Sequence, residues 1–308
     1  MRACIDIGGT KVSVSLNDPA EPMVLRATRR EATAHTGDAG ALARQVIRLV
    51  EEACAEAGIA PAQVQAAGVA APGPFVEVDG GTGLSTPNIC GGLAAAAGRL
   101  PNGWTQVPLE APLRQRFTRV RIENDGIAAL EAERRWGALQ GIDHCAYVTW
   151  STGVGCGLCV GGVALRGKQG NAGHLGHVFV SDDTQAVCGC GNVGDLEALV
   201  GGASIERRFG EPAAALLDRA ATGNSGALAV VDELCRVMGR ALYAIVALGD
   251  LQRISLGGGV FLHHQELLLP RLQAQLTGRL PAMTDGCALV PAGLGARVGD
   301  YGALALLD

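Results

Sequence analysis

The sequence of 308 residues lacks the features by which several large classes of protein are recognised. No long basic run stands out, only pairs such as Arg29-Arg30 and Arg134-Arg135, and the formal net charge is −5. A nucleic-acid-binding surface needs a positive stripe, so we expect no nucleic-acid partner. No apolar stretch reaches the roughly 18 residues of a membrane span, and we expect no membrane partner. The opening MRACIDIGGTK also lacks the charged and apolar regions of a signal peptide.

A disulfide framework is missing too, although the chain contains ten cysteines. Their spacing does not match that of small secreted domains, which indicates a reducing, cytoplasmic location. The CxxC pair of Cys156 and Cys159 lies in an apolar segment, where thiols that fill a core are more common than redox pairs. Hydrophobic residues make up 48% of the chain and charged residues only 18%, so we expect a sizeable core and no extensive disorder.

Glycine, by contrast, is abundant: there are 45 glycines, many of them in GG and GxG pairs beside apolar runs. Residues 3–7 form an apolar run that ends at Gly8-Gly9, and residues 11–16 alternate in polarity, which predicts a strand, a tight turn and a returning strand. About 145 residues further along, CAYVTW, STGVGCG and LCV repeat this order. Two copies of one glycine hairpin predict a duplicated, two-lobed α/β nucleotide-binding fold.

The rest of the chain shows alternating strand and helix patterns. Helices are predicted at 38–57, 127–136, 227–248 and 297–307, and strands at 64–70, 120–122 and 253–256. The composition of residues 80–103, rich in Gly, Thr, Pro and Asn, is typical of an irregular functional loop. We expect a lobe boundary near residue 120, with lobes at 1–120 and 121–296.

Three glycine motifs are suited to binding a nucleotide. In Asp6-Ile7-Gly8-Gly9-Thr10-Lys11 a carboxylate precedes a turn whose backbone N–H groups can approach phosphate, and Asp6 would hold Mg²⁺ through oxygen. Thr152 and Gly153 in the second turn would face the β- and γ-phosphates. Gly257-Gly258-Gly259 would let adenosine lie against the backbone. Each motif alone also fits an ordinary turn, whereas the three in this order predict an ATP site.

The segment Glu123-Asn124-Asp125 stands where a predicted strand gives way to a helix. Phosphoryl transfer requires positioning, charge neutralisation and an acceptor for the proton of the nucleophile. Asp125 can be that acceptor, and Asn124 can hydrogen-bond neighbouring hydroxyls. The alternative is a helix N-cap, for which Asn and Asp are favoured residues.

Seven motifs resemble, in order and over nearly the whole chain, those of the ROK family (repressor, open reading frame, kinase): DIGGTK, PGP at 72–74, END at 123–125, STGVG, AGHLGH at 172–177, CGCGNVGDLE at 188–197 and the late GGGV. The resemblance implies a two-lobed, actin-like (hexokinase or ASKHA type) fold with a central cleft, in which residues 297–308 return to the first lobe. It implies ATP-dependent transfer to a sugar, with Asp125 as the base. The sugar-binding residues that it implies are Gly73, Thr86, Asn124, Asp125, His174, His177 and Glu197.

Two departures from the family pattern bear on the choice of sugar. Many family glucokinases read AGExGH where this chain has His174, and GTG where it has Ser151-Thr152-Gly153. Both variations resemble bacterial N-acetylmannosamine kinases. A neutral His offers one donor and one acceptor, whereas Glu accepts from two hydroxyls. We therefore expect N-acetylmannosamine, or another N-acetylhexosamine, to be phosphorylated at its 6-hydroxyl; glucose, mannose or fructose is the alternative.

A third departure concerns metal. The family zinc site uses a His and three cysteines, and here His177, Cys188 and Cys190 are accompanied by Asp195 in the third cysteine position. Zinc accepts carboxylate oxygen, so we expect structural Zn²⁺ on these four residues. It would fix His177 and hold Glu197 against the sugar. The alternative is two buried free thiols in a loop without metal.

Two other classes compete with a kinase. ROK repressors carry a DNA-binding helix-turn-helix ahead of the first glycine strand, and Asp6 leaves no room for one in this sequence. A non-catalytic sugar sensor would not need Asp125 together with an intact DIGGTK. The expectation is therefore an ATP-dependent sugar kinase, and closed homodimers are the common state of such enzymes.

Overall fold

The computed structural model describes residues 1–96 and 98–308, and the chain divides into two compact units. Unit 1 comprises Met1–Ala132, Arg166–Asn171 and Arg297–Asp308; unit 2 comprises Glu133–Leu165 and Ala172–Ala296. The division falls after Ala132 and not near residue 120, where the sequence pattern placed it. The reason is that the strand and most of the helix that follow residue 120 pair and pack within unit 1.

Unit 1 is built on a five-stranded sheet of order β3-β2-β1-β4-β8. Its strands are β1 (Arg2–Ile7), β2 (Lys11–Asn17), β3 (Leu25–Ala32), β4 (Ala66–Ala71) and β8 (Arg119–Asn124). β1 pairs antiparallel with β2 and parallel with β4, and β4 pairs parallel with β8. The predicted first hairpin is confirmed, whereas the sequence pattern did not reveal β3.

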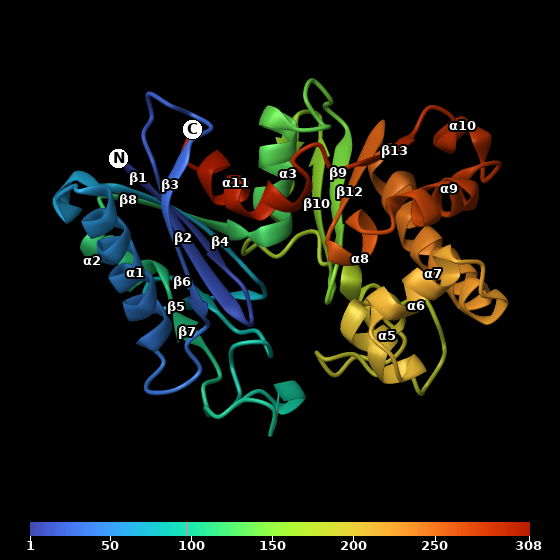
Figure 1. Ribbon diagram of the computed structural model, residues 1–308, viewed down its shortest axis with the longest axis horizontal. Helices are drawn as coiled ribbons and strands as arrows, with labels where there is room; N and C mark the ends of the chain where they lie inside the picture. The colour runs from blue at the N-terminus through green and yellow to red at the C-terminus, as the bar shows by residue number, and fades with distance from the viewer. Residues whose placement is uncertain (97) are drawn as a thin grey trace. The chain divides into compact units, whose positions relative to one another are not determined.

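Unit 2 contains a second sheet of the same design, with the order β11-β10-β9-β12-β13 (Figure 1). Its strands are β9 (Cys145–Trp150), β10 (Val154–Val160), β11 (Val163–Ala164), β12 (Arg253–Gly257) and β13 (Ala288–Pro291). β9 pairs antiparallel with β10 and parallel with β12, as β1 does with β2 and β4. The repeated glycine hairpin thus belongs to a repeated sheet, and its returning strand begins four residues before the predicted Leu158 because Val154–Gly157 already pair with β9.

The other elements of unit 1 are α1 (Ala41–Ala57), α2 (Glu110–Arg116), the first part of α3 (Asp125–Trp136), α11 (Val298–Ala305), and the small sheet β5 (Phe75–Val78), β6 (Gly81–Leu84) and β7 (Val107–Pro108). Short 3₁₀ turns lie at Pro61–Gln63, Ala94–Ala96 and Gly295–Arg297, the last of these reaching into unit 1 from unit 2. α1 ends at Gly58 as predicted, because this glycine adopts φ 68°. The loop predicted at 80–103 is irregular only in part, since it contains β6.

Unit 2 holds most of the helices. They are α4 (Leu196–Val200), α5 (Gly202–Phe209), α6 (Ala213–Ala221), α7 (Ser225–Gly249), α8 (Gly259–Leu262), α9 (Gln265–Leu276) and α10 (Pro281–Thr284), with a 3₁₀ turn at Leu175–His177. The long helix predicted at 227–248 is confirmed as α7, which begins where the Asn224 side chain accepts a hydrogen bond from the Ala227 N–H. Among the described residues, we find no helix with the length and apolar character that crossing a bilayer demands.

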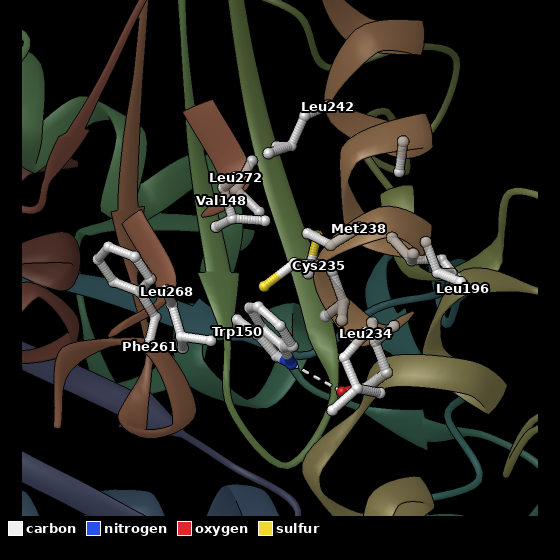
Figure 2. Packing of buried hydrophobic residues seen from close by; sticks show 14 of the residues in the cluster. Val148, Trp150, Leu196, Leu234, Cys235, Met238, Leu242, Phe261, Leu268 and Leu272 are labelled. Atoms are coloured by element: carbon white, nitrogen blue, oxygen red, sulfur yellow. Dashed lines mark hydrogen bonds between the residues drawn. The ribbon is translucent and has the colours of Figure 1, made fainter. Parts of the chain in front are cut away.

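Each unit has its own hydrophobic core. Figure 2 shows the core of unit 2, where Trp150 at the end of β9 lies among side chains of α7 and of the segment around Phe261. Trp150 is 2% exposed, and its indole N–H donates to the Val200 carbonyl oxygen at 2.7 Å. A buried Trp requires such an acceptor, and this bond ties the end of β9 to α4. The glycine turn that follows Trp150 is therefore held by the core beneath it.

Candidate active site

Hydrogen bonds from neighbouring residues hold the conformation of the first glycine turn. The Gly8 N–H donates to the Lys11 carbonyl at 2.8 Å, which closes the turn. The Thr33 hydroxyl donates to the Gly8 carbonyl at 2.7 Å, and His35 Nε2 lies 2.9 Å from the Gly9 carbonyl. Since the Gly8 N–H is already bonded, the part of this turn that can meet a phosphate is its tip, at Gly9 and the exposed Thr10.

Gly9 is required by packing as well as by any ligand. A Cβ at this position would lie 2.8 Å from Asn88 Cβ and 3.3 Å from the Asn88 carbonyl oxygen. The glycine therefore lets residue 88 approach the turn from the side of the predicted loop 80–103. From the sequence, Gly9 was explained by the close approach of a phosphate to the backbone. Its packing against Asn88 could not be predicted.

Asp6, at the end of β1, lies beside a second acid that the sequence pattern did not reveal. Burial raises the pKa of Asp6, and the Asp300 carboxylate raises it further, while Lys11 and Arg30 lower it. Asp300 lies on α11, where a Cβ on the preceding Gly299 would be 3.2 Å from Asp6 Oδ2. Two acids at the exit of β1 make the region attractive to a cation, which is the environment that the predicted Mg²⁺ requires.

Asp125 is the first residue of α3, directly after β8. The Gly126 N–H donates both to Asn124 Oδ1, at 2.9 Å, and to Asp125 Oδ1, at 2.8 Å. Asn124 is buried and acts as the cap of the helix, so the capping explanation holds for its amide oxygen. Asp125 is exposed.

The protein surroundings raise the pKa of Asp125 to about 6, chiefly by burial and then through the charge of Asp6, against the lowering effect of the Gly126 N–H. Solvent nevertheless reaches the side chain. We therefore expect the full rise only when a substrate displaces that water. A carboxylate with a pKa near 6 is ionised at neutral pH yet basic enough to accept a proton.

In unit 2, the second glycine turn encloses a carboxylate from α4. Glu197 Oε2 accepts the Val154 N–H at 2.9 Å, and a Cβ on Gly153 would overlap this oxygen. Gly153 is therefore needed to admit Glu197, whatever it does for phosphate. Thr152 is exposed at the tip, and its carbonyl accepts the Ala203 N–H at 3.1 Å, which fixes the turn to α5.

The three glycines of the third motif are required for different reasons. A Cβ on Gly257 would overlap the Tyr147 hydroxyl, and one on Gly258, which has φ 86°, would overlap the Trp150 backbone. Within the described part of the chain, a Cβ on Gly259 meets nothing within 4 Å. Packing alone explains the first two glycines, and only Gly259, at the start of α8, leaves open backbone for a ligand.

His174 and His177 flank the 3₁₀ turn before the metal loop, with ring centroids 5.9 Å apart and an interplanar angle of 23°. Burial lowers the pKa of His174, and the neighbouring His177 lowers it further. The Nε2 atom of His174 is buried and, among the described residues, has no hydrogen-bond partner. A buried polar atom without a partner is unfavourable, so this nitrogen is suited to meet a polar group of a ligand.

His177, Cys188, Cys190 and Asp195 converge, each offering one ligand atom, with all four atoms within 4.8 Å of one another. His177 Nδ1 lies 3.0 Å from Asp195 Oδ2, 3.5 Å from Cys190 Sγ and 3.9 Å from Cys188 Sγ. The other oxygen of Asp195 caps α4 by accepting the Ala198 N–H at 2.8 Å. Asp195 is fully buried, so its orientation is fixed by both bonds.

Gly73 and Thr86, the remaining predicted sugar contacts, lie in unit 1. Gly73 precedes Pro74 through a cis peptide bond, and Thr86 is only 2% exposed. The Asn171 side chain bonds both the N–H and the carbonyl of Phe75, at 2.7 and 2.9 Å, and so supports the turn that carries Gly73. Asn171 stands next to the AGHLGH motif and was not singled out from sequence.

The predicted residues therefore fall into two groups, each within one unit. Unit 1 holds Asp6, Gly8, Gly9, Thr10, Lys11, Gly73, Thr86, Asn124 and Asp125. Unit 2 holds Thr152, Gly153, His174, His177, Cys188, Cys190, Asp195, Glu197, Gly257, Gly258 and Gly259.

Comparison with known proteins identifies the family. The model of the ROK family matches residues 2–308. The chain belongs to the ROK family. It is 33% identical to an N-acetylmannosamine kinase of Shigella boydii serotype 18 over 86% of this chain and 85% of that protein.

Solved ROK structures share the fold. The ROK hexokinase of Thermus thermophilus is 32% identical, with a TM-score of 0.76 over 99% of this chain and 97% of that one. A ROK family glucokinase from Streptomyces griseus, solved in complex with glucose and AMPPNP, is 27% identical, with a TM-score of 0.70 over 99% and 98%. The fold is therefore the actin-like α/β fold predicted from the motifs.

The ROK zinc site can be tested against the four converging residues. Zinc bonds of about 2.0–2.3 Å in a tetrahedron require donor atoms about 3.3–3.8 Å apart. Of the six separations among the four donor atoms, four lie between 3.0 and 3.9 Å, and all six are within 4.8 Å. The hydrogen bond to Asp195 raises the pKa of His177, against the effect of burial. The donor set fits zinc, with Asp195 Oδ2 in place of a thiolate.

The metal loop is also joined to the second glycine turn. Cys188 Sγ lies 3.8 Å from Glu197 Oε1, and the other oxygen of Glu197 bonds the Val154 N–H. An ordered metal loop would therefore restrain Glu197 through the cysteine. The sequence motif CGCGNVGDLE placed these residues close in the chain, but it did not show that Glu197 reaches the glycine turn.

Proposed function

We propose that this ROK protein is a sugar kinase that transfers the γ-phosphoryl group of ATP to the 6-hydroxyl of a sugar. The observation that carries the proposal is the exposed carboxylate of Asp125 at the corner of β8 and α3, whose pKa is raised to about 6. This ionised but basic carboxylate is suited to general base catalysis.

In the proposed reaction Asp125 accepts the proton of the 6-hydroxyl as the hydroxyl oxygen bonds to the γ-phosphorus. The bond between the γ-phosphorus and the bridging oxygen breaks, and ADP leaves with the electron pair. The donation from Gly126 to Asp125 Oδ1 orients the carboxylate, leaving Oδ2 for the substrate. Phosphoryl transfer asks little more of the protein than such positioning and charge neutralisation.

The phosphates would be bound by the tips of the two glycine turns. Gly9 and Thr10 in unit 1, and Thr152 and Gly153 in unit 2, are the positions where backbone and hydroxyl donors can be offered. Asp6 would hold Mg²⁺, which supplies positive charge to the phosphates. Lys11 is exposed at the end of the same turn and adds a cation.

N-acetylmannosamine is the sugar that we propose first. Support comes from His174, whose buried Nε2 lacks a partner and whose pKa is lowered, so that the ring is neutral and offers one donor and one acceptor. The resemblance to an N-acetylmannosamine kinase at 33% identity points the same way. Glucose is an equally supported alternative, because a glucokinase and a hexokinase match over almost the whole chain.

Zinc, in this proposal, is structural. His177, Cys188, Cys190 and Asp195 would take all four positions of a tetrahedral ion, and structural sites are closed in this way. The residues themselves then act on the sugar: we propose that the His177 ring, presented by the ordered loop, donates a hydrogen bond from Nε2 to one hydroxyl group, and that the restrained Glu197 carboxylate accepts one from another.

The test is a coupled assay of ADP release with Mg²⁺ and ATP across N-acetylmannosamine, N-acetylglucosamine, glucose, mannose and fructose. We expect turnover with at least one sugar, and the highest kcat/KM with N-acetylmannosamine. A glucose preference would select the alternative substrate. Sugar binding by calorimetry without ADP release from any of the five would contradict the kinase and favour a sensor.

A further inference from the structure

α3 is the helix that carries Asp125, and it crosses the border between the two units. Its residues 125–132 belong to unit 1, and Glu133 is the first residue that belongs to unit 2. Glu133 lies eight residues after Asp125, about 12 Å along the helix axis. The helix is continuous from Asp125 to Glu133, so the contacts that hold Glu133 restrain the C-terminal half of the helix that begins with Asp125.

Glu133 is held by a buried cluster that the mechanism above does not use. Its side chain is 0% exposed. Oε2 accepts the Ala138 N–H at 2.8 Å, the Gly293 N–H at 3.0 Å and the Ser255 hydroxyl at 3.1 Å, and Oε1 accepts the Leu294 N–H at 2.8 Å. A buried carboxylate persists only when its lone pairs are satisfied in this manner.

The partners of Glu133 come from three separate parts of unit 2. Ala138 follows the end of α3, and Ser255 lies in the middle of β12. Gly293 and Leu294 follow β13 and lie just before the point, after Ala296, where the chain passes back to unit 1. Two segments that lead between the units, one at the end of α3 and one after β13, are therefore bonded to the same carboxylate. We call them the crossing segments. Through Ser255 the carboxylate also bonds the sheet of unit 2.

Two glycines show that this cluster is tightly built. A Cβ on Gly137 would overlap the Glu133 carboxylate. A Cβ on Gly293 would lie 2.6 Å from the Ala138 backbone nitrogen. The two crossing segments thus meet backbone to backbone, with no room for a side chain. In unit 1 the same two segments meet again, since a Cβ on Gly302 of α11 would lie 3.2 Å from Ala128 of α3.

We propose that Glu133 is a positioning residue: it clamps the paired crossings to unit 2 so that α3 delivers Asp125 in a fixed orientation. The inference rests on the proposed function for its consequence in catalysis, but the clamp itself is independent of the reaction. Gln has nearly the same shape, yet its amide nitrogen cannot accept a hydrogen bond. Whichever way the Gln amide points, a backbone N–H of the cluster faces another donor.

The first test is amide hydrogen exchange in the wild type and in Glu133→Gln, which needs no turnover. In the wild type the amides of Ala138, Gly293 and Leu294 should be among the slowest in unit 2 and should open together. In the variant we expect all three to exchange about 10- to 100-fold faster, the factor that a lost charge-assisted hydrogen bond carries. The amide of Gly126, at the far end of α3, should also exchange faster.

The second test is kinetic. If Glu133 positions Asp125, Glu133→Gln should lower kcat by about 10- to 100-fold with little change in sugar affinity, because small misplacements of a reacting group have effects of this size. Asn224→Ala is the matched control: it removes the cap of α7 in the same unit and should leave kcat unchanged. Ser255→Ala, which removes one donor of four, should have a small effect.

Several results would overturn the proposal. They are wild-type amides at 138, 293 and 294 that exchange fast or independently, a Glu133→Gln protein with unchanged Gly126 exchange and kcat, or an Asn224→Ala protein that loses as much kcat. If Glu133→Gln does not fold, Gly137→Ala replaces it, because it displaces the carboxylate without removing it. A wild type that releases no ADP with any sugar defeats the proposed function alone, since the exchange results still decide the clamp.

Discussion

The two glycine hairpins have the same place in two sheets of the same order, but they are built for different tasks. In unit 1 the turn between the paired residues Ile7 and Val12 has four residues, whereas in unit 2 the turn between Trp150 and Val154 has three. The first turn has the acids Asp6 and Asp300 beside it. The second is filled by Glu197 from α4.

The same backbone hairpin can therefore be surrounded by different chemical groups in the two units. The first hairpin brings carboxylates to the end of its strand, which suits a cation. In the second, the Val154 N–H that follows the turn donates to a carboxylate of its own unit, and the Thr152 carbonyl accepts the Ala203 N–H of α5. We infer that unit 1 supplies the Mg²⁺ ligand and the base, that both turns offer their tips to phosphate, and that unit 2 adds His174 and Glu197 as sugar-binding side chains.

The largest effect is expected from Asp125→Asn, which removes the base from unit 1. Proton transfer to a positioned base contributes about 10²–10⁴-fold, so ADP release should fall by that factor. Sugar binding, measured by calorimetry, should persist, because His174 and Glu197 belong to unit 2. Turnover within a factor of about two of the wild type would show that Asp125 is not the base.

The same substitution should also raise thermal stability at neutral pH. In the folded protein without substrate, the pKa of Asp125 is raised above its ordinary value of 3.8, although the full rise to about 6 needs water to be displaced. Its contribution to stability is therefore fully present below pH 3.8 and is lost as the pH rises through the raised pKa. At pH 7 the ionised group destabilises the fold, and Asn removes that effect. A lower Tm for Asp125→Asn at pH 7 would contradict this sign.

The same substitution made in each turn, Gly153→Ala and Gly9→Ala, distinguishes the roles of the two turns. Gly153→Ala would force Glu197 Oε2 away from the Val154 N–H, whereas Gly9→Ala would press on Asn88. We expect Gly153→Ala to raise the sugar KM by about 10- to 100-fold, the factor for a lost hydrogen bond to a charged group. Gly9→Ala should act mainly on the ATP KM. Equal effects on both substrates in both variants would remove the distinction between the turns.

The metal loop belongs only to unit 2 and can be tested without activity. We expect about one zinc per chain by elemental analysis, since a single tetrahedral donor set is present. Asp195→Asn should keep the cap of α4 through Oδ1 but bind zinc less tightly, whereas Asp195→Ala should also lose about 1 kcal/mol from the missing cap. Freshly purified wild type with no zinc would contradict the site.

The smallest effect concerns the choice of sugar. His174→Glu places a second acceptor where the neutral ring stands, so the ratio of kcat/KM values should shift toward glucose by about 5- to 10-fold, a change that one altered hydrogen bond can produce. Glucose and N-acetylmannosamine compared in the same assay give this ratio. An unchanged ratio would mean that His174 does not discriminate between the two.

Much of this architecture could be predicted from the sequence because the glycine hairpins and the long helix α7 are strong local patterns. β3 and the small sheet of unit 1 were not found, since their strands are short or polar, as LRATRREA in β3 shows. The metal donors were expected because two motifs resemble the family zinc site: AGHLGH carries His177, and CGCGNVGDLE carries Cys188, Cys190 and Asp195. Asp300 and Glu133 could not be found in this way, because most of their partners are more than a hundred residues distant and no motif joins them.

The most direct test of the central claim is the pH dependence of kcat at saturating sugar and Mg·ATP, because kcat reports the complex in which substrate has displaced water from Asp125. With Asp125 as the base and its pKa raised to about 6, kcat should be level near neutral pH and fall tenfold per pH unit below about 6. The same protein should remain folded by circular dichroism over this range. A kcat that stays level down to pH 5 in folded protein would contradict the assignment of Asp125.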